Sequence, residues 1–128
     1  MKKQKKTVPD TREKLENICV WLAEKKATEI VALDLSSAKT AGYITEGIIV
    51  AGAGSLRHGQ GLADFALEKS KEHNYEFFQM EGYKNGLWIL LDFNDVVVNI
   101  FQNAQREIYR LEDLYPGATL LRDERQKS

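Results

Sequence analysis

The chain has 128 residues, of which 43% are hydrophobic and 29% are charged, and its formal net charge is −1. This length fits one domain with a single core, and the composition is typical of a globular protein rather than a disordered or membrane-spanning one. A net charge near zero argues against broad binding to nucleic-acid phosphates, including DNA, because such binding depends on excess Lys and Arg.

The start of the chain is basic. Residues 1–8 contain Lys2, Lys3, Lys5 and Lys6, with no apolar stretch behind them of the kind that makes a signal peptide. Apolar runs elsewhere fall short of the roughly 20 residues that a membrane helix needs. We therefore expect a cytoplasmic protein with a flexible basic tail at residues 1–8. Contact of this tail with RNA is the alternative to a solvated terminus, which we favour.

A first helix is predicted from Asp10 to about Lys26. Asp10 is the expected N-cap, and Glu13 completes the capping-box signature. An apolar stripe at helical spacing marks the buried side of this helix, formed by Leu15, Ile18, Cys19 and Leu22. Cys19 is the only cysteine, so an internal disulfide is excluded and we assign its thiol to core packing.

Two buried strands and a second helix are expected next. Residues 29–34 are a short apolar run, and the strand expected at about 44–51 has a continuously apolar centre at 48–50, which indicates strands covered on both faces. The intervening segment 36–42 is predicted to be a loop. A Gly-rich turn then leads into a helix with Ser55 as N-cap, and this helix ends near Asn74.

The second half of the chain reads mainly as strands. Residues 75–80 have a mixed pattern and form a weaker candidate strand. Residues 87–92 and 95–101 are strong strands separated by Phe93 and Asn94, and so short a connection demands an antiparallel hairpin.

A last helix and a tail complete the expected domain. Asn103 can cap the helix, and Pro116 with Gly117 can end it. Residues 118–128 are predicted to be a charged, mobile tail, so the folded domain is expected at 9–117. The order of elements predicts the α/β class, with a mixed sheet of about five strands and helices on both faces.

The turn at Gly52–Ser55 is the strongest enzymatic candidate, since glycines before a helix let backbone amides approach a phosphate. A nucleotidyltransferase would use such a turn, but its chemistry also requires converging carboxylates on metal ions. Asp92 and Asp95 are separated by a hairpin turn, and Asp64 lies within a helix. We therefore predict no catalytic residue, no metal site and no cofactor, and regard Ser55 as a helix cap.

The histidines offer little for catalysis. Arg57 and His58 suggest acid/base chemistry, but this needs a positioned partner. A hydrogen bond between His58 and its own cap is the preferred interpretation, and His73 is expected to complement the end of its helix. Their spacing does not predict a zinc site.

Aromatic and charged residues gather in the C-terminal half, as in many protein interfaces. They are Trp88, Phe93, Tyr109 and Tyr115 beside Asp92, Asp95, Arg106 and Glu112. Core packing with solvated charges explains the same residues equally well. An exposed cluster of this kind would also favour a weak homodimer.

A series of motifs gives a more specific indication. It comprises Ala32–Leu35, Gly54–His58 followed by Ala63 and Asp64, Glu81–Gly82, Trp88–Asp92, Asp95–Val98, Arg106, Tyr109 and Leu111–Tyr115. In order and spacing, this series resembles the ribosomal silencing factor, or iojap, family. The chain departs from the usual family pattern at Asn99, where His is common, and at Tyr115, where Trp is common.

The resemblance implies a nucleotidyltransferase-like fold without its metal carboxylates. It also implies a non-enzymatic protein that binds the large ribosomal subunit through ribosomal protein L-fourteen, sterically blocks association with the small subunit and represses translation. The expected contact residues are Trp88, Asp92, Asp95, Arg106, Tyr109, Glu112 and Tyr115. The alternative is a small nucleotidyltransferase-like enzyme that uses Ser55 and Asp92 on a nucleotide.

Overall fold

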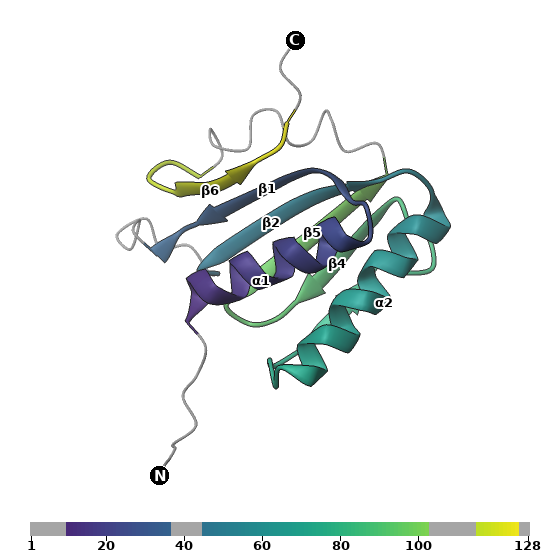
Figure 1. Cartoon of the computed structure of the whole chain (residues 1–128), viewed down its shortest axis with the longest axis horizontal. Coiled ribbons are helices and arrows are strands. Elements are labelled where there is room, and N and C mark those ends of the chain that lie inside the picture. Colours follow the sequence, from purple (N-terminus) through teal and green to yellow (C-terminus); the bar gives the residue numbers. More distant parts are fainter. Residues whose placement is uncertain (1–9, 37–44, 103–114, 126–128) are drawn as a thin grey trace.

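The computed structural model describes residues 10–36, 45–102 and 115–125 (Figure 1). The helices are α1 (Thr11–Glu24) and α2 (Leu56–Glu72), and the strands are β1 (Thr28–Asp34), β2 (Gly47–Ala53), β3 (Gln79–Glu81), β4 (Trp88–Asp92), β5 (Val96–Gln102) and β6 (Thr119–Asp123). The predicted last helix and most of the loop at 36–42 lie outside these residues. No helix in the described ranges is long and apolar enough to cross a membrane.

The strands form one mixed sheet in the order β3-β4-β5-β2-β1-β6. Only β2 and β5 run parallel among the described pairs, and the predicted antiparallel hairpin of β4 and β5 is confirmed. The α/β class with a mixed sheet is likewise confirmed. Both α1 and α2 lie on the same face of the sheet (Figure 1). The predicted last helix falls outside the described residues, so the expectation of helices on both faces stays a prediction.

The C-terminal segment corrects one prediction. Residues 119–123 form β6, which pairs antiparallel with β1, and so this part of the predicted mobile tail is ordered sheet. Its charged side chains suit a strand at the sheet edge, because charges there discourage pairing with a strand of another molecule. Arg122 pairs with Glu124, and Arg125 pairs with Asp123. Within the described residues the sheet therefore has six strands, where about five were expected.

The third strand is also shorter than predicted. Of residues 75–80, only Gln79 and Met80 belong to β3, which continues to Glu81. Tyr75 is instead buried beside α1, where its hydroxyl accepts a 2.8 Å hydrogen bond from Asn17. Tyr75 thus contributes an aromatic residue to the pattern that predicted a strand, although it lies outside the sheet.

The local signals that begin the helices act as predicted. Asp10 Oδ1 accepts a hydrogen bond from the Glu13 amide at 2.8 Å, and Ser55 Oγ accepts one from the His58 amide at 3.0 Å. Each cap satisfies an amide that the first helical turn leaves without a partner. Both helices then direct apolar side chains onto one core, which includes Leu15, Ile18, Leu22, Leu62, Ala63 and Ala66.

The opposite face of β1 and β2 is apolar as well, which explains why these strands are continuous apolar runs. A second buried cluster on this face consists of Val31, Leu33, Leu35, Ile48 and Val50. Among the described residues, Phe101, Tyr115 and Ala118 pack against it. This face is therefore buried over β1 and β2.

Candidate partner-binding face

The sheet surface over β4 and β5 differs from the apolar surface over β1 and β2. Ile89 and Leu91 are fully buried in the core beneath the helices. Because side chains alternate along a strand, Trp88, Leu90 and Asp92 point to the opposite side. We call this surface the Trp88 face, formed by Trp88, Leu90 and Asp92 of β4 with Val97, Asn99 and Phe101 of β5.

Trp88 is the most exposed aromatic side chain of this face, with 54% of its surface accessible. Its ring stacks on Phe101 at a centroid distance of 5.3 Å and an interplanar angle of 24°. Its indole Nε1 donates a 2.9 Å hydrogen bond to Asn99 Oδ1, while Asn99 Nδ2 donates to the Ile49 carbonyl at 3.3 Å. The indole is therefore held in one orientation while remaining open to a partner, as aromatic anchors of interfaces are.

The loop before β4 reaches this position because of a glycine. Gly82 has a positive φ of 81°, and a Cβ there would lie 2.0 Å from the Trp88 carbonyl oxygen. Any other residue would force the loop away from the start of β4. Gly82, singled out in the sequence as part of Glu81–Gly82, thus supports the backbone beneath the anchor.

Asp92 lies at the far end of β4 on the same face. Its Oδ1 accepts a hydrogen bond from the Asn94 amide at 2.8 Å, and Asn94 adopts a positive φ of 80°. The carboxylate therefore caps the hairpin turn that joins β4 to β5. It remains partly exposed and available to a second donor.

Asp95 faces the other way, towards α1. Its carboxylate lies 2.5 Å from Lys14 Nζ and accepts a 2.9 Å hydrogen bond from Thr11 Oγ1. The Lys14 side chain is only 6% exposed, so its charge depends on this partner. Asp95 therefore fastens α1 to the hairpin, and the structure separates it from Trp88 and Asp92.

The remaining predicted contact residues divide into two groups. Tyr115 is half-buried and packs against the apolar cluster on the side of the sheet that also carries Trp88. Arg106, Tyr109 and Glu112 lie outside the described residues. The structure thus brings Trp88, Asp92 and Tyr115 to one side of the sheet.

Asn99 and Phe101 also shape this face, although neither is among the contact residues expected from the sequence. Phe101 pairs directly with Trp88 across the β4–β5 ladder, and Asn99 holds its indole. The signal was available, because a hairpin with the turn at Phe93 and Asn94 fixes which residues face each other.

The polar side chains of Ser55 and His58 at the Gly-Ser turn make hydrogen bonds that stabilise the fold. His58 Nδ1 accepts a 3.0 Å hydrogen bond from the Gly54 amide, and its Nε2 donates to the Lys25 carbonyl at 2.8 Å. Together with the Ser55 cap, His58 ties the start of α2 to the end of α1. Within residues 10–36, 45–102 and 115–125, no group of three or more His, Cys, Asp or Glu side chains is placed to hold a metal.

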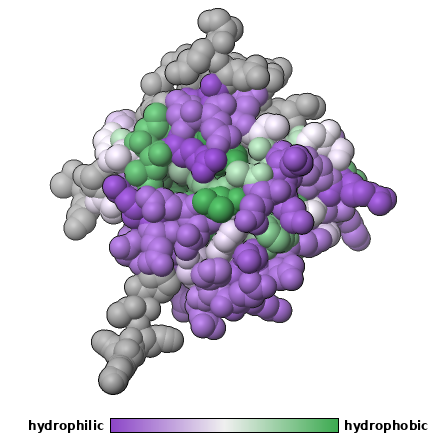
Figure 2. All heavy atoms as spheres, viewed as in Figure 1, coloured by the Kyte–Doolittle hydropathy of each residue, from purple (hydrophilic) through white to green (hydrophobic). Residues whose placement is uncertain are grey.

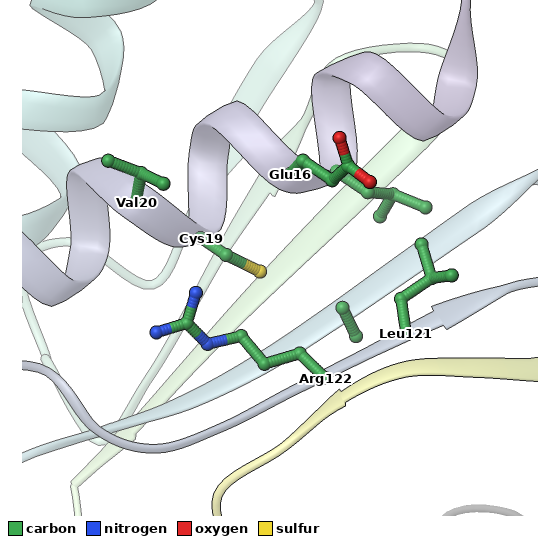
Figure 3. Close-up of a pocket in the computed structure, with 7 residues that line it drawn as sticks. Glu16, Cys19, Val20, Leu121 and Arg122 are labelled. Carbon is green, nitrogen blue, oxygen red and sulfur yellow. The ribbon is translucent and has the colours of Figure 1, made fainter.

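The helix-bearing side of the molecule is mostly hydrophilic, with small hydrophobic areas (Figure 2). One hollow of about 190 Å³ lies between α1 and β6, and Glu16, Cys19 and Val20 reach into it from α1 opposite Leu121 and Arg122 (Figure 3). Burial raises the pKa of the Cys19 thiol to about 12, so at neutral pH it stays protonated and unreactive.

Comparison with known proteins relates this chain to one protein family. The sequence model of the family described as "ribosomal silencing factor during starvation" matches residues 8–128. The ribosomal silencing factor RsfS of Halalkalibacterium halodurans is 32% identical over 95 residues, which cover 74% of this chain and 79% of that protein. Its namesake in Bacillus subtilis is 29% identical over 97 residues, covering 76% and 80%.

A solved structure supports the same assignment. The crystal structure of a protein from Chromobacterium violaceum superposes with a TM-score of 0.74 at 29% identity, covering 94% of this chain and 91% of that one. Because the family's sequence model spans nearly the whole chain, this protein belongs to the ribosomal silencing factor family.

Proposed function

We propose that this protein works in the cytoplasm by binding the large ribosomal subunit through ribosomal protein L-fourteen. In this position it blocks association with the small subunit and so represses translation. Membership of the family gives the general regulatory role. The observation that best supports a binding mechanism is the exposed but rigidly held indole of Trp88.

The proposed mechanism is steric and requires no chemical reaction. A standard protein interface buries about 800 Å² on each partner. The chain exposes 7505 Å², so roughly a tenth of its surface is enough. Docking through one sheet face leaves the rest of the domain, with both helices, to occupy space that the small subunit needs.

Trp88 is the proposed central anchor, with Asp92 and Tyr115 as neighbouring contacts. Arg106, Tyr109 and Glu112 remain part of the proposed surface, since they follow β5 in the chain. Asp95 contributes indirectly, because its ion pair with Lys14 positions the hairpin that carries this face.

Sedimentation with separated ribosomal subunits tests the proposal. Wild-type protein should pellet with large subunits and not with small ones. Trp88→Ala should weaken this binding about thirtyfold, because loss of a central aromatic anchor costs about 2 kcal/mol or more. Val20→Ala removes a comparably exposed apolar side chain from α1 and serves as the control. Equal pelleting with both subunits would contradict the proposal.

In the absence of ribosomes, we propose that the Trp88 face supports a weak homodimer, since exposed aromatic surface favours self-association. Light scattering at rising protein concentration should show mass increasing above the monomer, and Trp88→Ala should reduce this increase. A strict monomer at high concentration would exclude the dimer.

A further inference from the structure

A second groove lies away from the Trp88 face, between α2 and the segment that leads into β3. It has a volume of about 430 Å³ and is lined by Asp64, Leu67, Glu68, Ser70, Lys71, Tyr75 and Phe77. We call it the α2–β3 groove. It lies on the helix side of the sheet, because α2 packs on that side and Phe77 contacts the buried ring of Phe93.

Exposed apolar side chains lie at this groove and next to it, because Phe77 lines it and Phe78 is the following residue. Phe77 is 38% exposed and its neighbour Phe78 is 60% exposed. The Phe77 ring is fixed against Phe93 at a centroid distance of 5.4 Å. Two adjacent exposed phenylalanines are unusual on a protein surface and are typical of a place where another chain docks.

The neighbouring strand offers backbone groups for pairing. β3 is the last strand of the sheet on this side and pairs with β4 alone among the described strands. An edge strand can accept an extended peptide as an additional strand, and a groove beside it can receive alternate side chains of that peptide.

The charges around the groove are predominantly acidic. Asp64 and Glu68 line it, Glu76 precedes the two phenylalanines, and Glu81 is the last residue of β3. Among its lining residues, Lys71 carries the only positive charge. Tyr83 donates a 2.9 Å hydrogen bond to the Asp64 carboxylate. This balance favours a basic partner.

We propose that the α2–β3 groove binds an extended protein segment in which apolar residues alternate with Lys or Arg. The segment pairs with β3 as an added strand. Its apolar side chains enter the groove against Phe77 and Leu67, and its cations face Glu81 on the opposite side of the strand. The groove lies on the opposite side of the sheet from Trp88, although Glu81 pairs with Leu90 at the margin of the Trp88 face. The proposal does not depend on the proposed ribosome contact.

A fluorescein-labelled peptide of alternating Lys and Leu residues is the probe, and fluorescence anisotropy with the full chain is the measurement. Glu81→Lys and Phe77→Ser should each weaken binding at least tenfold, because the first reverses the charge that faces the peptide's cations and the second removes an apolar contact in the groove. Glu16→Lys and Val20→Ser make the same types of change on the exposed surface of α1 and should stay within twofold of wild type. Melting temperatures near wild type would show that all four variants are folded.

Strand pairing has its own test. In an extended peptide, the backbone amides of alternate residues point to opposite sides, so only one set faces β3. N-methylation of that set should abolish binding, whereas N-methylation of the other set should be tolerated. Equal weakening by Glu81→Lys and Glu16→Lys would indicate unspecific charge attraction and overturn the proposal. Equal binding of both methylated peptides would overturn strand addition. A large gain in affinity after removal of residues 1–8 would assign the groove to the chain's own basic tail instead.

Discussion

Replacing Asp95 by Ala distinguishes a structural role for this carboxylate from a direct role in ribosome contact. The substitution leaves Lys14 Nζ without its ion-pair partner, although the Lys14 side chain is only 6% exposed. Breaking a buried pair on one side typically costs 3–5 kcal/mol, because a charge remains out of water. Asp95 itself is 21% exposed, so we expect the lower end, about 3 kcal/mol.

Thermal unfolding followed by circular dichroism measures this loss. A domain of this size loses a few degrees for each kcal/mol, so Asp95→Ala should melt about 10 °C below wild type. Adding Lys14→Met removes the stranded charge and should recover more than half of the loss. Below its melting temperature the Asp95→Ala variant should still pellet with large subunits.

The opposite pattern would refute this reasoning. If Asp95→Ala melts within about 2 °C of wild type, the buried pair contributes far less than its geometry indicates. If the variant also fails to pellet with large subunits, Asp95 is a contact residue as the family resemblance first implied.

Three further predictions concern the rest of the domain. Burial raises the pKa of Asp34, but hydrogen bonds from Ser36 and Arg12 outweigh it and the pKa is lowered. The stabilisation from this carboxylate is therefore present above its unfolded pKa of about 3.9 and lost as pH falls through the folded value, so Asp34→Asn should destabilise less at pH 3 than at pH 6 in urea unfolding. Cys19, with its pKa raised to about 12, should react with a thiol reagent far more slowly in the native protein than in urea, and fast native labelling would contradict its burial. Ser55→Ala should cost about 1 kcal/mol through loss of the α2 cap and should spare large-subunit pelleting, whereas loss of pelleting would implicate the Gly-Ser turn in function.

The sequence anticipated only part of the arrangement at the candidate site. The aromatic and charged composition around Trp88 and Asp92 left an interface and core packing equally possible, and the family resemblance favoured the interface. The structure places both residues on one side of the sheet, with Trp88 exposed. Asp95 has the same sequence surroundings, yet it points to Lys14. Composition cannot distinguish these carboxylates, because their orientation depends on where α1 crosses the hairpin.

The sequence by itself determined the features that depend on near neighbours. The caps at Asp10 and Ser55 follow from amides within one helical turn, and the hairpin follows from a connection too short for any other arrangement. The apolar runs of β1 and β2 also indicated burial on both faces of the sheet, because side chains of consecutive residues point to opposite faces.

Only the tertiary structure decided which distant segments meet. The parallel pairing of β2 with β5 and the addition of β6 to β1 join residues far apart in the chain. Backbone hydrogen bonds between strands are nearly independent of side-chain identity, so a charged segment such as Thr119–Asp123 gives little sign of its partner. It is ordered because β1 offers an edge to complete, and its charged side chains can remain at the surface.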